Sequence, residues 1–314
     1  TYDDRVLRSY HVALQTKPLV ILPGISGTGK TRLTRLYADA VHGIGSALQE
    51  NPYYLLVAVQ PDWHNARDLL GYFNGLTNKF HATALLRFFH RAASDPQQPY
   101  YACLDELNLA RPEYYLAPIL SALETADHLI DLGAPGAQVE TPDGSTLRNP
   151  FRLPLNVALI GTVNVDESTF TLSDKLLDRA NLIELTHVDL DAFRQSYRGP
   201  VEPNAWRVLA EVHTTLAGAG QPFGYRTLTE VLRYLEKARE VLSTERALDL
   251  QIKQKVLPKV RGEDSPRLRQ ALDELLAIFG PAAGGSEDRF PDSAEKVRRM
   301  RRRLEREGYT DFYS

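Results

Sequence analysis

The sequence is poor in several features that mark particular classes of protein. Its 314 residues include one cysteine, Cys103, so an internal disulfide framework is excluded and a reducing compartment is expected. The N-terminal residues are charged and no apolar run is long enough to cross a bilayer, so we expect a cytoplasmic protein that does not associate with membranes. The net charge of -3 excludes a strong overall basic field, so any contact with nucleic acid requires a local patch.

The remaining composition is that of an ordinary globular protein. Hydrophobic residues make up 43% of the chain and charged residues 25%, and the length allows two domains. The eight histidines include no H-E-x-x-H pattern, so a zinc site is not indicated. The sequence begins with Thr1 rather than Met, which suggests a processed chain or a piece of a longer one.

The clearest motif is a glycine-rich loop that fits G-x-x-x-x-G-K-[ST]. Apolar residues 18–22 precede it, and apolar residues at helical spacing follow it, which predicts a strand, a phosphate-binding loop and a helix. Lys30 is expected to reach the β- and γ-phosphates of a nucleotide, and the Thr31 hydroxyl to hold Mg²⁺. The residues expected to bind nucleotide are Gly24, Ile25, Ser26, Gly27, Thr28, Gly29, Lys30 and Thr31.

A second signal lies downstream, where the apolar run 100–104 ends in two adjacent acids. Asp105, at a strand tip beside the glycine loop, is expected to hold Mg²⁺, and Glu106 to act as the general base for an attacking water. By itself, an apolar run followed by two acids is a solvent-exposed strand end as often as it is part of a catalytic site. Its position after a phosphate loop favours the catalytic interpretation.

A third polar residue, Asn164, follows the apolar run 156–161. We expect its side chain to contact the γ-phosphate or the attacking water, although such an asparagine in isolation is usually a turn residue. Residues 129–153 are predicted to form a hairpin excursion, because Asp143-Gly144 is a tight-turn signal.

Two arginines and two surface features complete the candidates. Arg179 has no acidic partner that the sequence reveals, and a surface ion pair is the alternative to a functional role. Arg226 is expected near the start of a helix capped by Thr227. The segment 71–75 is expected to be a loop with two aromatic residues. Its aromatic side chains either face the central pore of a ring-shaped assembly or pack on their own domain. The arginine-rich segment 298–303 is expected to be a solvated helix face, with binding of an anionic partner as the alternative.

The composition changes near residues 197–203, where strand patterns cease. We predict an α/β nucleotide-binding domain at residues 1–198, with a parallel sheet flanked by helices, and a smaller all-helical lid domain at residues 199–314. The helices expected before and after this change include 2–15, 80–93, 204–217, 227–242, 246–257, 265–279 and 293–307.

Together these pieces resemble the AAA+ ATPase superfamily of P-loop NTPases. The loop 24–31 is similar to Walker A, and Leu104-Asp105-Glu106 is similar to Walker B. The resemblance assigns Asn164 to sensor 1, Arg179 to the arginine finger that acts on a neighbouring subunit, and Arg226 to sensor 2. It implies Mg²⁺-dependent hydrolysis of ATP or GTP and assembly into a homo-oligomeric ring.

Within the superfamily, the motifs at 105–108 and 161–164 are similar to those of the McrB-like motor subunit of McrBC-type restriction systems. That family hydrolyses GTP as a hexamer and works with a nuclease subunit on modified DNA. Two other functions stay open: a protein remodeller such as a MoxR-like chaperone, and a nucleotide-gated scaffold that hydrolyses little.

Overall fold

The computed structural model describes residues 2–45, 49–166, 170–281 and 286–313. The chain divides into two compact units. The sheet unit consists of Tyr2–Gly24 and Lys30–Leu185, and the helical unit of Ile25–Gly29 and Thr186–Ser314. The predicted domain boundary after residue 198 lies beyond a short helix, Leu190–Ser196, that this division groups with the helical unit.

The sheet unit is built on five parallel strands in the order β11-β1-β10-β5-β2. Their bounds are β1 Leu19–Gly24, β2 Tyr54–Ala58, β5 Tyr100–Asp105, β10 Val157–Asn164 and β11 Ala180–Leu182. The register pairs Gly24 with Asn164 and Gly161 with Leu104, so the carboxyl ends of β1, β10 and β5 lie at one edge. This edge is where ligands bind in open parallel sheets.

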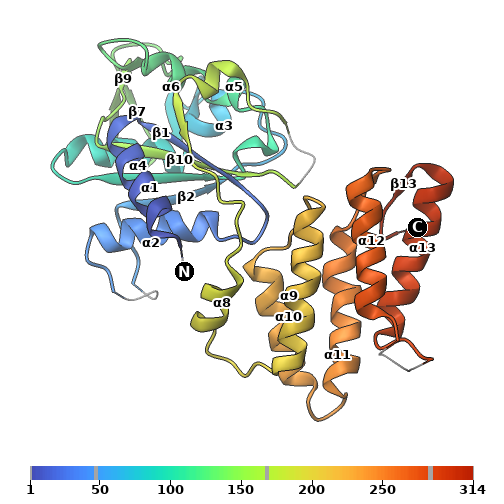
Figure 1. The fold of residues 1–314 in the computed structure, drawn as a ribbon. Coiled ribbons are helices and arrows are strands. Elements are labelled where there is room, and N and C mark those ends of the chain that lie inside the picture. The colour runs from blue at the N-terminus through green and yellow to red at the C-terminus, as the bar shows by residue number, and fades with distance from the viewer. Residues whose placement is uncertain (1, 46–48, 167–169, 282–285, 314) are drawn as a thin grey trace. The chain divides into compact units, whose positions relative to one another are not determined.

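Helices cover both faces of this sheet (Figure 1). The alternation along β1 divides its side chains: Val20 and Leu22 belong to a core with α1 and α2, whereas Leu19 and Ile21 belong to a larger core with α4, α5 and α6. The helices are α1 Asp4–Thr16, α2 Lys30–Val41, α3 Ala66–Leu70, α4 Ala84–Ser94, α5 Pro112–Tyr115, α6 Ala117–Ala122 and α7 Asp174–Leu177, with the 3-10 turn η1 at Leu107–Leu109. The predicted α/β fold with a flanked parallel sheet is confirmed.

Three antiparallel strand pairs extend from the sheet unit. They are β3 Gly71–Asn74 with β4 Lys79–Ala82, β6 Leu129–Ile130 with β9 Phe151–Arg152, and β7 Gln138–Glu140 with β8 Thr146–Arg148. The hairpin predicted within 129–153 is therefore confirmed, with Val139 opposite Leu147.

The first of these pairs corrects two predictions. Residues 71–74 were expected in a loop and 80–82 at the start of a helix, but 71–74 form β3 and 80–82 belong to β4. Phe73 packs against the core of the sheet unit, and Tyr72 stacks on His81.

Cys103 lies in the middle of β5 and is fully buried. Burial raises the pKa of its thiol to about 12. It is therefore an inert part of the core between the sheet and α2.

The helical unit contains the remaining elements. They are α8 Leu190–Ser196, α9 Pro203–Gly218, α10 Tyr225–Ala238, α11 Thr244–Gln251, η2 Ile252–Val256, η3 Leu257–Lys259, α12 Pro266–Phe279, α13 Pro291–Glu307 and a two-stranded pair of β12 Gly262–Glu263 with β13 Tyr309–Thr310. The predicted helical region is confirmed, although the small β12–β13 pair was not expected.

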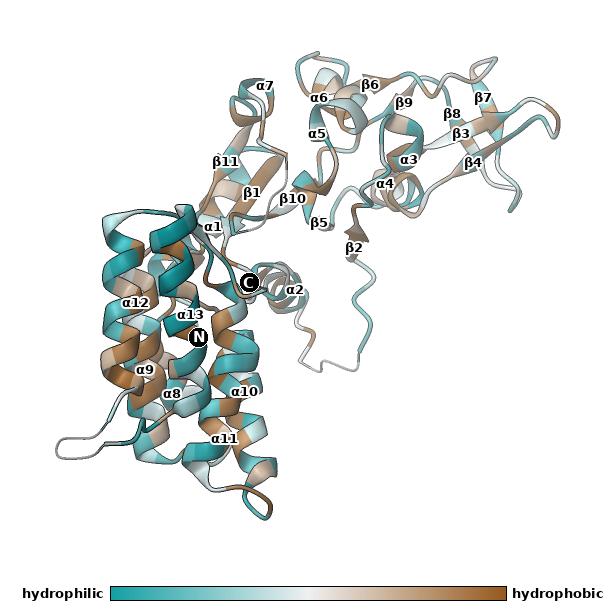
Figure 2. Ribbon diagram, turned by 90° about the vertical axis from the view of Figure 1, so that its right-hand side faces the viewer, coloured by the Kyte–Doolittle hydropathy of each residue, from teal (hydrophilic) through white to brown (hydrophobic). Residues whose placement is uncertain are grey.

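The long helices of this unit are amphipathic, with apolar stripes that meet in one core (Figure 2). Helix α10 begins at Tyr225 with Gly224 as its N-cap, so the prediction that Thr227 caps it is wrong: Thr227 lies inside the helix and is buried. Several arginines of α13 pair with nearby acids, as in the Arg298–Asp288 pair at 2.7 Å and the Arg301–Asp273 pair at 2.7 Å. Within the described residues, no helix combines the length and apolarity that a membrane span requires.

Candidate functional site

The centre of the candidate site joins the helix after the glycine loop to the end of β5. Thr31, the second residue of α2, donates its hydroxyl hydrogen to Oδ1 of Asp105 at 2.6 Å. Asp105 is the last residue of β5. Because α2 follows β1 directly through the loop, the fold brings these two side chains together although they lie far apart in sequence.

Lys30 begins α2 and is 6% exposed. Its ammonium group donates to the carbonyl oxygen of Gly24 at 2.9 Å, which keeps the charge at the end of β1. A buried ammonium is costly unless it has polar partners, so its position at this strand end indicates a site built for anionic ligands.

Glu106 and Asn164 also meet at this edge. Asn164 ends β10 and is 9% exposed, and its amide donates to Oε1 of Glu106 at 3.4 Å. Glu106 has left-handed backbone angles, φ 56° and ψ 50°, which turn the chain from β5 into η1. The carboxylate is exposed and can accept a proton from water, and the neighbouring amide orients it.

The rest of the glycine loop, Ile25–Gly29, is grouped with the helical unit. Gly27 and Gly29 have positive φ values of 82° and 96°, which a side chain would strain. The backbone N–H of Arg226 donates to the Gly27 carbonyl at 3.2 Å, and a Cβ at Gly27 would lie 2.9 Å from Cβ of Arg226. Arg226 is exposed near the start of α10, as predicted.

Arg179 follows α7 and forms an ion pair with Glu124 of the same chain. Its guanidinium also donates to the carbonyl oxygen of Lys175. The structure thus supplies the acidic partner that the sequence did not reveal, and Arg179 is not among the side chains that meet at Asp105.

The donor set near Asp105 fits a magnesium ion. Mg²⁺ prefers hard oxygen ligands, retains several waters and is usually held by one or two protein side chains together with substrate phosphates. The Thr31 hydroxyl and the Asp105 carboxylate are oxygen donors already within 2.6 Å of each other. Within the described part of the chain, no group of three or more His, Cys, Asp or Glu side chains could hold a metal ion. The two oxygen donors leave the other ligand positions of such an ion to water and substrate phosphates.

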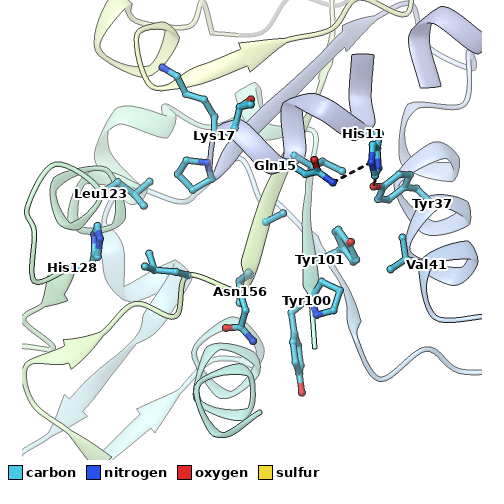
Figure 3. A pocket seen from close by; sticks show the side chains of 17 residues that line it. His11, Gln15, Lys17, Tyr37, Val41, Tyr100, Tyr101, Leu123, His128 and Asn156 are labelled. Atoms are coloured by element: carbon cyan, nitrogen blue, oxygen red, sulfur yellow. Dashed lines mark hydrogen bonds between the residues drawn. The ribbon is translucent and has the colours of Figure 1, made fainter. Parts of the chain in front are cut away.

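The sheet unit also has a cavity of about 610 Å³ at the opposite edge, near the amino ends of β5 and β10 (Figure 3). In Figure 3 a chain of hydrogen bonds links Gln15, His11 and Tyr37 along one wall, with distances of 3.1 and 2.7 Å. None of the residues predicted to bind nucleotide or to catalyse its hydrolysis lines this cavity. The candidate site is therefore the carboxyl edge rather than this cavity.

Sequence reasoning missed Thr162 and Glu124. Thr162 lies on β10, is buried, and contacts both Asp105 and Glu106. Thr162 belongs to the motif 161–164, in which sequence reasoning assigned a role only to Asn164, and it lies two residues before Asn164 on the same side of the strand.

Comparison with known families agrees with this geometry. Residues 19–180 match the family described as AAA domain (dynein-related subfamily), and residues 184–309 match a family described as a domain of unknown function (DUF8727). None of the curated proteins compared with the chain matches it. The first match spans just over half of the chain, includes β1, β5 and β10, and carries nucleotide hydrolysis as the general activity of the family. The chain therefore belongs to the dynein-related subfamily of AAA domains and is a member of the AAA+ ATPase superfamily.

Proposed function

We propose that the chain is the motor of an McrB-like restriction or defence system for modified DNA. It hydrolyses ATP or GTP as a homo-oligomeric ring, expected to be a hexamer, and works with a nuclease subunit. The observation that carries the hydrolytic part is the 2.6 Å contact between Thr31 and Asp105, beside the Glu106–Asn164 pair.

In this proposal Thr31 and Asp105 hold Mg²⁺, which when bound offsets negative charge on the β- and γ-phosphates. Backbone N–H groups of the loop 24–29 bind phosphate oxygens, and Lys30 adds a positive charge beside them. These groups fix the nucleotide for an in-line attack and need not move during it.

Glu106 then accepts a proton from the attacking water, and Asn164 holds the carboxylate and the water in place. Arg226 reports the state of the nucleotide to the helical unit, because its backbone already contacts the loop at Gly27. Arg179 leaves Glu124 and contacts the nucleotide of a neighbouring subunit.

The McrB-like branch is favoured by the two motifs Asp105–Asn108 and Gly161–Asn164 and by the inserted hairpin. Strands β7 and β8 lie between β5 and β10 in sequence, which is the position of the hairpin in that branch. The side chain of Asn108, two residues after Glu106, donates to the carbonyl oxygen of Phe170 at 3.2 Å. The motif thereby ties the acidic strand end to the segment after Asn164.

The test is steady-state hydrolysis of ATP and of GTP, with and without modified DNA. We expect hydrolysis that DNA stimulates, and we expect Glu106→Gln to bind nucleotide normally while its turnover falls by about 10²-fold or more. Glu295→Gln, on the exposed face of α13, is the matched control and retains wild-type turnover.

Other outcomes assign the chain differently. Stimulation by a protein client and not by DNA would favour a MoxR-like remodeller. Negligible turnover of the assembled ring would favour the nucleotide-gated scaffold. Unaltered hydrolysis by Glu106→Gln would remove Glu106 from the role of base.

A further inference from the structure

Thr162 occupies a central position between the two acids. It lies on β10, the strand between β1 and β5, and is 2% exposed. Its hydroxyl donates to Oδ1 of Asp105 at 2.6 Å and accepts a hydrogen bond from the backbone N–H of Glu106 at 2.9 Å. One hydroxyl therefore contacts both residues of the acidic pair, with its hydrogen used on one and a lone pair on the other.

The same Asp105 oxygen accepts a hydrogen bond from Thr31 at 2.6 Å. Two hydroxyl groups from two different elements, α2 and β10, thus converge on Oδ1. Convergent donors restrict rotation of the carboxylate about its terminal bond, because turning it would break both contacts. The carboxylate is held in one orientation before any ligand binds.

Thr162 also fixes the peptide between the two acids. Glu106 has φ 56°, an unfavourable conformation for a residue with a side chain, and such conformations persist only where surrounding contacts determine them. The bond from Glu106 N–H to Thr162 is one such contact, and the bond from Leu109 N–H to the Glu106 carbonyl at 2.8 Å is another. In this conformation Oε1 of Glu106 lies 3.4 Å from the Asn164 amide.

We propose that Thr162 is a positioning residue for hydrolysis. Its single hydroxyl holds the Asp105 carboxylate and the Glu106 backbone in a fixed position relative to each other. The inference rests on the proposed catalytic role of Glu106. Threonine suits this task because its branched side chain is rigid on a strand, so the hydroxyl has one preferred direction. Thr162 acts through the two acids and need not touch the substrate.

The experiment compares Thr162→Val, which keeps the shape and removes the hydroxyl, with Thr162→Ser, which keeps the hydroxyl. We expect the valine variant to lose about 10- to 100-fold in kcat, since a small misplacement of catalytic groups costs about that much. KM and the affinity for a fluorescent ATP or GTP analogue stay within a few fold of wild type, and the serine variant recovers most of kcat. Thr146→Val, at an exposed position of β8, is the matched control.

A double variant separates positioning from a general structural role. If Thr162 acts through Glu106, adding Thr162→Val to Glu106→Gln causes little further loss of kcat, because residues that act as a unit are strongly non-additive. Full additivity of the two losses would overturn the proposal, as would a valine variant with wild-type kcat.

Two further outcomes complete the test. If the valine variant does not fold, Thr162→Ala and Thr162→Ser decide: an impaired alanine variant beside an active serine variant supports the proposal, and equal turnover overturns it. A wild-type protein that hydrolyses neither ATP nor GTP would instead reject the proposed function on which the inference rests.

Discussion

At the scale of single residues, Gly24 sits where two backbone segments come unusually close. A Cβ at this position would lie 2.5 Å from the carbonyl oxygen of Leu185 and 2.9 Å from its carbonyl carbon. Both atoms belong to the backbone, so Gly24→Ala forces the end of β1 to shift. We expect a loss of about 1–3 kcal/mol in the free energy of unfolding, measured by urea denaturation.

Gly75 provides the control for this substitution, because a Cβ there would meet open space. Gly75→Ala should leave the unfolding midpoint within the error of the measurement. Equal effects of the two substitutions would mean that the approach of Leu185 to β1 does not restrict position 24.

Motif residues are predictable where the chemistry is local in sequence. Lys30 and Thr31 are identified by the loop pattern, and Asp105 by its place after an apolar strand. Thr162 and Glu124 escaped prediction because their partners are supplied by folding: alternation along β10 does not reveal which strand is its neighbour. Glu124 meets Arg179 only because α6 and α7 belong to one folded unit.

At the scale of elements, helix α13 begins without a side-chain cap from its own N-cap residue, Phe290. Asp249, on α11, takes that role: its carboxylate accepts hydrogen bonds from the N–H groups of Ser293 at 2.8 Å and Asp292 at 3.0 Å. Asp249 is 1% exposed. An acid at this helix end also interacts favourably with the helix dipole.

We predict that Asp249→Ala destabilises the helical unit by about 2–4 kcal/mol, because it leaves one buried and one partly buried N–H group unsatisfied. Thermal unfolding followed by circular dichroism measures the change. Asp273→Ala removes an acid that pairs with Arg301 at the surface and should cost about 1 kcal/mol or less. A loss no larger for Asp249→Ala than for Asp273→Ala would contradict the capping role.

Long elements were predictable, and short ones only where a turn signal such as Asp143-Gly144 marked them. The helices α9, α12 and α13 have enough turns for their apolar stripes to be read from the sequence. Strands β3 and β4 have four residues each, too few to establish an alternating pattern. Capping of α13 by Asp249 is likewise a tertiary contact, which no local sequence pattern predicts.

At the scale of the whole molecule, the proposed role of Arg179 makes turnover depend on assembly. An arginine supplied by a neighbouring subunit contributes about 10³- to 10⁵-fold to the rate. We therefore expect turnover per subunit to rise steeply with protein concentration, and Arg179→Ala to abolish the rise. Activity measured across a dilution series tests both expectations.

Lys175→Ala is the control for this variant, since Lys175 is exposed on the same short helix and contacts Arg179 only through its backbone. It should retain the concentration dependence of wild type. Constant turnover per subunit at every dilution of the wild-type protein would reject a role for Arg179 between subunits.

The isolated thiol in β5 has a practical consequence. Thiolate is the reactive form, and Cys103 is fully buried with its pKa raised to about 12, so an alkylating reagent modifies only molecules in which β5 has been exposed. A ligand that binds only the folded form lowers that exposed population by a factor of one plus the ratio of the ligand concentration to its dissociation constant. ATP or GTP with magnesium, at about 100 times its dissociation constant, should therefore slow alkylation by about 100-fold. Mass spectrometry of the alkylated chain would thus report ligand-linked opening of the sheet without an engineered probe, and identical labelling rates with and without nucleotide would contradict that linkage.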